Sequence, residues 1–229
     1  MLNVVSIVML LAITVWWLIV RRLREKPWTK QGVIAGSQEG VASSAPKIGL
    51  WFFLGMVSSL FGLFASAYML RMTSSHTGLA AWQPLDEPSI LWVNTLVLVV
   101  ASAAMQIARA RADNGDLGGV RSYFTAAGVL TVVFLAGQVL AWRLANASGQ
   151  YGPSSAAYSF FVLLTAVHGL HLVGGLFVLS RTASRVWRGI GQNSVVARSQ
   201  IRLSVQLCTL YWHWLLLIWL GLFALLLST

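Results

Sequence analysis

Three histidines lie inside long apolar stretches of this sequence, where an imidazole could do chemistry. They are His168, His171 and His213. Imidazole is an axial ligand of haem and a ligand of copper and iron. A haem site between membrane helices would need two imidazoles facing each other, which His213 and one member of the pair could supply. The alternative, which we favour, is that each imidazole bonds to a neighbouring helix or a lipid headgroup. The three-residue step of the pair also differs from the i, i+4 spacing of a zinc pair.

Carboxylates, lysines and arginines are absent from the interiors of the apolar stretches. The acidic residues all lie in polar segments or at the ends of apolar ones: Glu25, Glu39, Asp86, Glu87, Asp113 and Asp116. Pumps and ion-coupled transporters keep such groups along their pathway, so we do not expect a self-contained transporter. The sequence also lacks phosphate-binding glycine motifs and a nucleophile elbow. The single cysteine, Cys208, excludes an intrachain disulfide and a C-x-x-C zinc pattern.

The histidine pair lies in an apolar stretch at 158–179, which is long enough to cross a bilayer as a helix. His168 and His171 share one face of that helix, and Leu164 and Gly175 continue it on either side. An unpartnered imidazole in hydrocarbon is costly, and glycine lets another helix approach closely. We therefore expect this face to contact protein rather than lipid.

The composition predicts an all-α, polytopic membrane helix bundle. Of the 229 residues, 57% are hydrophobic and only 10% are charged, and backbone groups inside lipid must be satisfied within their own segment. Six transmembrane helices are predicted, at 2–20, 48–70, 89–108, 123–142, 158–179 and 203–227. The predicted domains are an N-terminal transmembrane helix at 1–20, a flexible cytoplasmic linker at 21–46 and a five-helix membrane domain at 47–229.

The first apolar stretch could also be a signal peptide. We favour a retained helix, because no basic residue precedes the stretch, and it ends in Arg21, Arg22 and Arg24 rather than at a small-residue cleavage site. The linker after it is basic and then rich in Gly, Ser and Ala, a composition that cannot bury a core.

Small residues recur at three- and four-residue steps along the second stretch. They are Gly55, Ser58, Ser59, Gly62 and Ser66. Small side chains let membrane helices approach closely. This small-residue face therefore permits close packing against another helix.

The basic residues predict the orientation. If the loops alternate sides, every Lys and Arg except Arg71 and Arg143 falls on one side, which the positive-inside rule puts in the cytoplasm. Both termini then lie on the outer side of a bacterial plasma membrane. The net charge of +10 is thus mainly a topology signal and does not indicate a nucleic-acid partner. Arg181, Arg185 and Arg188 share one helical face, which suits a secondary contact with anionic lipid.

Five segments resemble subunit III of the haem–copper oxidases, the cytochrome c and quinol oxidase complexes. The segments are KIGLWFFLGMVSSLFGLFASAY, ILWVNTLVLVVAS, GVLTVVFLAGQVLAW, the F-x-x-x-T-x-x-H-G-x-H pattern from Phe161 to His171, and YWHWLLLIWLGLF. The resemblance covers roughly 47–227, and the histidine and Tyr-Trp-His motifs carry most of its specificity. The chain departs from the family where acids usually stand, at Val57, Ala141 and Leu216. These departures weaken any expectation of a proton-uptake role.

The resemblance implies an accessory subunit of an oxygen-reducing, proton-pumping complex, an enzyme in which this chain has no catalytic residues. It implies a hetero-oligomer with catalytic subunit I and subunit II, haem and copper in those partners only, and structural phospholipids held between helix groups. We expect a lipid and helix-packing site formed by His168, His171, Tyr211, Trp212 and His213. Two alternatives are a subunit III-like protein of a nitric oxide reductase system and an independent haem-binding electron-transfer membrane protein.

Overall fold

The structure is a computed structural model that describes residues 38–75, 89–147, 156–187 and 195–228. The chain divides into two compact units, Met1–Ser44 and Ala45–Thr229, and the second is described here by itself. The helix predicted at 1–20 and most of the linker predicted at 21–46 lie outside the described residues. The predicted division into domains therefore stays a prediction.

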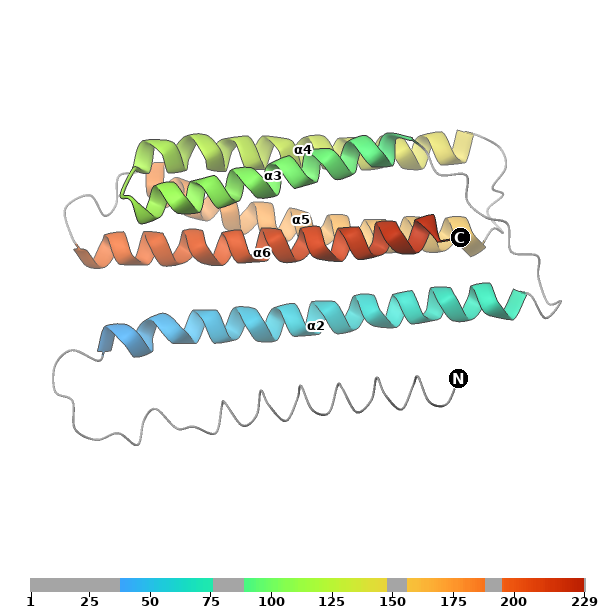
Figure 1. Cartoon of the computed structure of the whole chain (residues 1–229), viewed down its shortest axis with the longest axis horizontal. Coiled ribbons are helices and arrows are strands. Elements are labelled where there is room, and N and C mark those ends of the chain that lie inside the picture. Colours follow the sequence, from blue (N-terminus) through green and yellow to red (C-terminus); the bar gives the residue numbers. More distant parts are fainter. Residues whose placement is uncertain (1–37, 76–88, 148–155, 188–194, 229) are drawn as a thin grey trace, which may run out of the picture. The chain divides into compact units, whose positions relative to one another are not determined.

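Long helices make up the described part of the chain, and no strand occurs there. The helices are α2 (Gln38–Ser75), α3 (Ile90–Asp113), α4 (Leu117–Ala147), α5 (Ala156–Trp187) and α6 (Val195–Leu227). In Figure 1, α3 to α6 run lengthwise beside one another. Each of the five helices contains a stretch long and apolar enough to cross a membrane. The prediction of an all-α membrane bundle is confirmed for five of the six expected helices.

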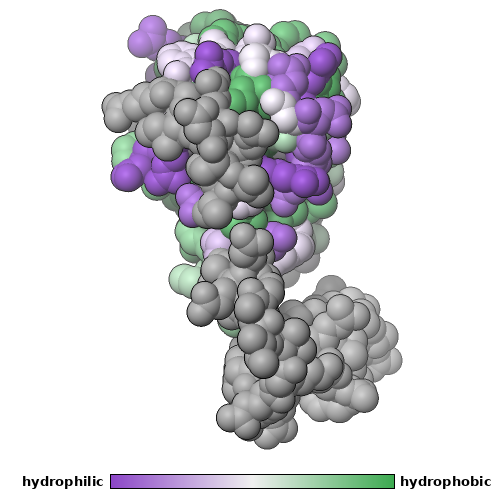
Figure 2. All heavy atoms as spheres, turned by 90° about the vertical axis from the view of Figure 1, so that its left-hand side faces the viewer, coloured by the Kyte–Doolittle hydropathy of each residue, from purple (hydrophilic) through white to green (hydrophobic). Residues whose placement is uncertain are grey.

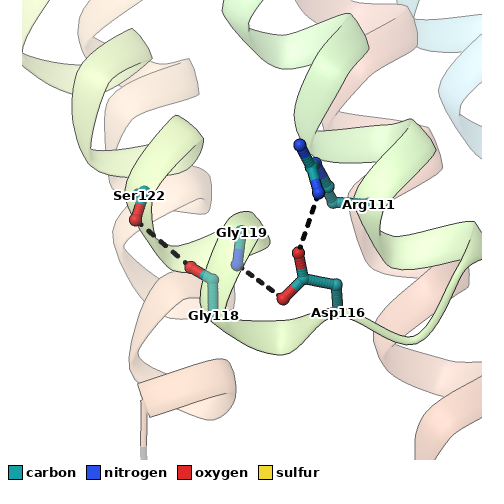
Figure 3. A network of polar contacts seen from close by, with 5 residues as sticks. All are labelled: Arg111, Asp116, Gly118, Gly119 and Ser122. Carbon is teal, nitrogen blue, oxygen red and sulfur yellow. Dashed lines mark hydrogen bonds and ion pairs between the residues drawn. The ribbon is translucent and has the colours of Figure 1, made fainter.

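The turn between α3 and α4 has the sequence Asp-Asn-Gly at positions 113–115. Gly115 has a φ of 76°, a backbone conformation that glycine adopts without steric cost. The Asp116 carboxylate then accepts a hydrogen bond from the backbone N–H of Gly119 at 2.9 Å, as a helix N-cap does, and pairs with Arg111 at 3.3 Å (Figure 3). The helix α4 begins at Leu117 and ends at Ala147, so it is longer than the helix predicted at 123–142 from the apolar stretch.

Indole groups join the helices of the bundle through threonine hydroxyls. Trp142 on α4 donates to Thr165 on α5 at 2.9 Å. From α6, Trp212 donates to Thr131 at 3.2 Å and Trp219 donates to Thr95 at 3.0 Å. A buried indole N–H needs a partner, so these bonds set the register of α3 to α6.

Bulky side chains hold α2 against the other helices. Leu54, Val57, Phe61 and Tyr68 recur along one face of α2 and are all buried. The Trp214 indole of α6 donates to the hydroxyl of Ser58 at 3.0 Å. The inward face of α2 is therefore built mainly from aromatic and aliphatic side chains.

The small-residue face of α2 does not pack against the other described helices. Gly55, Ser59, Gly62 and Ser66 are exposed in the described structure, and nothing lies within 4 Å of where a Cβ on either glycine would be. Only Ser58 lies at the contact. The large side chains on the opposite face bury more apolar surface, so they face the other helices.

Hydrophilic residues gather at the end of the bundle where α3 turns into α4 (Figure 2). Arg202 on α6 pairs with Asp113 at the end of α3. Arg121 on α4 donates to the carbonyl oxygen of Val186 at 2.9 Å, near the end of α5. A cation is favourable at the C-terminal end of a helix, so Arg121 stabilises this end of the bundle.

Close approach of α3 and α4 requires glycine at position 137. A Cβ there would lie 2.1 Å from the Oδ1 atom of Asn94, a side chain that is only 3% exposed. We expect Gly137→Ala to destabilise the protein by about 1–3 kcal/mol through overpacking, seen as a lower midpoint of thermal unfolding in detergent. Gly62→Ala is the matched control, because its Cβ would enter open space. Equal midpoints for the two variants would contradict the α3–α4 contact.

Candidate functional site

A cavity of about 630 Å³ lies between α2, α5 and α6. One wall comes from α2, through Pro46, Gly49, Leu50 and Phe53. The opposite walls come from α5 and α6: Leu170, His171, Gly174, Gly175, Val178, Arg181, Thr182, Arg185, Ser204, Leu207, Cys208, Tyr211 and Trp212. Ligand pockets in proteins typically measure about 300–1,000 Å³, so this space is large enough to hold a ligand.

The lining of the cavity is apolar along most of its length and basic at one end. Arg181 and Arg185 both line it and are exposed. They are one turn apart on α5, so their guanidinium groups share a face. Chemically, the cavity combines a long apolar surface with a site for an anionic group.

Gly175 shapes the wall between α5 and α6. A Cβ at this position would lie 2.7 Å from a ring atom of Tyr211 and 3.2 Å from the Trp212 ring. Glycine therefore lets these two rings lie directly against α5. The Tyr211 hydroxyl also donates a hydrogen bond to the backbone carbonyl of His171 at 2.9 Å.

His171 lies between this wall and α2. Its Nδ1 atom is 2.8 Å from the carbonyl oxygen of Val167, one turn earlier in α5. Its ring centroid is 5.6 Å from that of Phe61 on α2. The imidazole thus forms part of the contact that holds α2 beside α5.

His168 lies in the core of the bundle and is fully buried. Its ring centroid lies 5.2 Å from that of Trp219, 6.0 Å from Phe134 and 6.3 Å from Phe61. Leu164 and Gly175 on the same face are also buried. The prediction that this face contacts protein is confirmed.

His213 faces α3 rather than the histidine pair. Its Nδ1 atom contacts the hydroxyl of Ser102, and its Nε2 atom lies 3.1 Å from the side-chain oxygen of Gln106. The structure therefore brings His171, Tyr211 and Trp212 together at the cavity, and it places His168 and His213 elsewhere. Within the described residues, no group of three or more His, Cys, Asp or Glu side chains could hold a metal ion.

The α2 side of the cavity, which includes Leu50 and Phe53, was not predicted from the sequence. Three helices far apart in sequence build the cavity, so no local signal marks its wall.

At the three positions where the subunit III family usually carries acids, this chain has apolar side chains, and these side chains also lie in apolar surroundings. Val57 and Ala141 are buried, and Leu216 packs against the core.

Replacement of His171 by leucine should loosen the contact of α2 with α5, because it removes the imidazole packed on Phe61. If the chain has the oxidase partners that the resemblance implies, we expect less of it to stay bound to them after extraction in detergent, and no change in their haem absorption spectrum. Val173→Leu, on the exposed face of the same helix, is the control and should leave both unchanged. An altered spectrum would show that His171 is a haem ligand instead.

Comparisons with known proteins point to one family. The sequence model of the family cytochrome c oxidase subunit III matches residues 1–228, a wider range than the motifs covered. A probable cytochrome c oxidase subunit 3 of Mycobacterium leprae is 30% identical over 173 residues, or 73% of this chain and 81% of the relative. A protein of the same description from Mycobacterium tuberculosis is 33% identical over 133 residues, or 56% of this chain and 61% of the relative. The chain therefore covers less than two thirds of that relative. A cytochrome bo(3) ubiquinol oxidase subunit 3 of Pseudomonas aeruginosa is 26% identical over 178 residues, or 76% of this chain and 80% of the relative.

Proposed function

Because this chain belongs to the cytochrome c oxidase subunit III family, we propose that it is the non-catalytic accessory subunit of a respiratory haem–copper terminal oxidase. Subunit III is part of a multi-subunit oxidase complex, and the resemblance seen in the motifs is thus confirmed at the level of the family. In our proposal the chain packs beside catalytic subunit I in a complex that also holds subunit II. The partners carry the haem and copper, reduce oxygen to water and pump protons.

The observation that carries the proposal is the cavity between α2, α5 and α6. An apolar channel with two guanidinium groups at one end has the chemistry of a phospholipid site. The acyl chains would lie along Leu50, Phe53 and Tyr211, and the phosphate would lie at Arg181 and Arg185. A lipid held there would join α2 to α5 and α6 and would stabilise the subunit.

The proposed orientation fits this lipid site. The exposed basic residues Arg181, Arg185 and Arg202 stand at one end of the helices, and Arg71 and Arg143 stand at the other. With the richer end in the cytoplasm of a bacterium, the guanidinium groups of the cavity lie in the leaflet that holds anionic lipid. Both termini then lie on the periplasmic side of the plasma membrane.

Loss of the two guanidinium groups should weaken lipid binding. A basic residue near anionic lipid contributes about 1 kcal/mol, so we expect Arg181→Gln with Arg185→Gln to lower the amount of tightly bound anionic phospholipid several-fold. Mass spectrometry of lipid extracted from the purified complex measures this. The control is Arg143→Gln, since this exposed arginine lies at the opposite end of the bundle. Equal lipid content in both variants would contradict the proposed site.

The proposed function is tested by purification from the native membrane through a tag on the C-terminus. We expect a haem–copper catalytic subunit to accompany the chain, and the chain separated from it to show no haem absorption. If the chain comes alone and carries haem, its histidines are ligands and the proposal is wrong. A nitric oxide reductase as the accompanying enzyme would also contradict it.

A further inference from the structure

Within the described residues, three buried polar side chains of the bundle core have atoms that lack a hydrogen-bond partner. Asn94 on α3, Gln138 on α4 and His168 on α5 are 3%, 2% and 0% exposed. Within the described residues, five of their polar atoms have no hydrogen-bond partner: Asn94 Nδ2, Gln138 Nε2 and Oε1, and His168 Nδ1 and Nε2. More than about 90% of buried polar groups in proteins have a partner, so this set needs an explanation.

The contacts between α4 and α5 place Gln138 and His168 at the same depth. The two helices are antiparallel neighbours, and the bond from Trp142 to Thr165 sets their register. Gln138 lies one turn before Trp142, and His168 lies about one turn after Thr165, so both are displaced in the same direction from that bond. The ring contact between Phe134 and His168, at 6.0 Å, agrees with this register.

Asn94 reaches the same depth from α3. Its Oδ1 atom lies 2.1 Å from the position that a Cβ on Gly137 would take. Gly137 is the residue directly before Gln138 in the sequence. Polar side chains from three helices thus lie at one depth, in an interior that neither lipid nor bulk water reaches.

We propose that Asn94, Gln138 and His168 form an internal water-binding site between α3, α4 and α5. The amide of Gln138 offers a donor and an acceptor, a neutral imidazole offers one of each, and Asn94 Nδ2 is a donor. Water suits this mixed set, because it donates and accepts and typically makes about three hydrogen bonds when buried. A metal cation does not suit it, since one imidazole and two amides supply too few strong ligands. The site depends only on the packing of this chain and does not rest on the proposed function.

The direct test is a structure of the wild-type protein, extracted from its membrane with the subunits that accompany it, at a resolution that shows ordered water. We expect a density peak within hydrogen-bond distance of both the Gln138 amide and the His168 ring. A direct bond between the two side chains would overturn the proposal. So would a map that shows water elsewhere in the bundle and none here.

A double-mutant cycle supplies the second readout. Gln138→Met and His168→Phe each leave one side of a shared water unsatisfied, so we expect each to lower the unfolding midpoint by roughly 2–4 °C. The double variant should lose less in unfolding midpoint than the two single variants lose together, because it removes both side chains that bond to the shared water. Gln106→Met combined with His168→Phe is the control and should be additive, since Gln106 bonds to His213 on another face. Additive losses in both cycles would contradict a shared site.

Discussion

The structure depends on one constraint: hydrocarbon offers no hydrogen-bond partner to a polar group. Helices satisfy the backbone, and the side chains that need partners must find them on neighbouring helices. The indoles of Trp142, Trp212 and Trp219 meet this need by donating to threonines across helix contacts. These bonds also set how far each helix lies along its neighbour, so the satisfaction of three N–H groups determines the register of α3 to α6.

The same register decides what each histidine can do. His168 is enclosed by Trp219 and Phe134 because these rings lie at its depth. His171, only one turn further, lies at the edge of the cavity beside Tyr211. His213 is held by Ser102 and Gln106. Imidazoles that look alike in sequence therefore serve as a core group, part of a cavity wall and a link between α3 and α6.

The cavity exists because α2 is held differently from the other helices. Glycines let α3 approach α4 and let α5 approach α6, at Gly137 and Gly175. On α2, the glycines face outward and large side chains such as Phe61 face inward. Bulky inward side chains keep a helix backbone at a distance, which leaves the space along Leu50 and Phe53 where the proposed lipid would lie.

The sequence by itself determined the all-helical membrane class, five of the spans and the protein-facing side of the histidine helix. These depend on apolar length and helical period, which nearby residues carry. Only the tertiary structure decided that Gly55 and Gly62 face outward, that His213 lies apart from His171, and that α2 closes a cavity. Each of these depends on the volumes and partners of side chains on helices far apart in the chain, and no local pattern encodes that information.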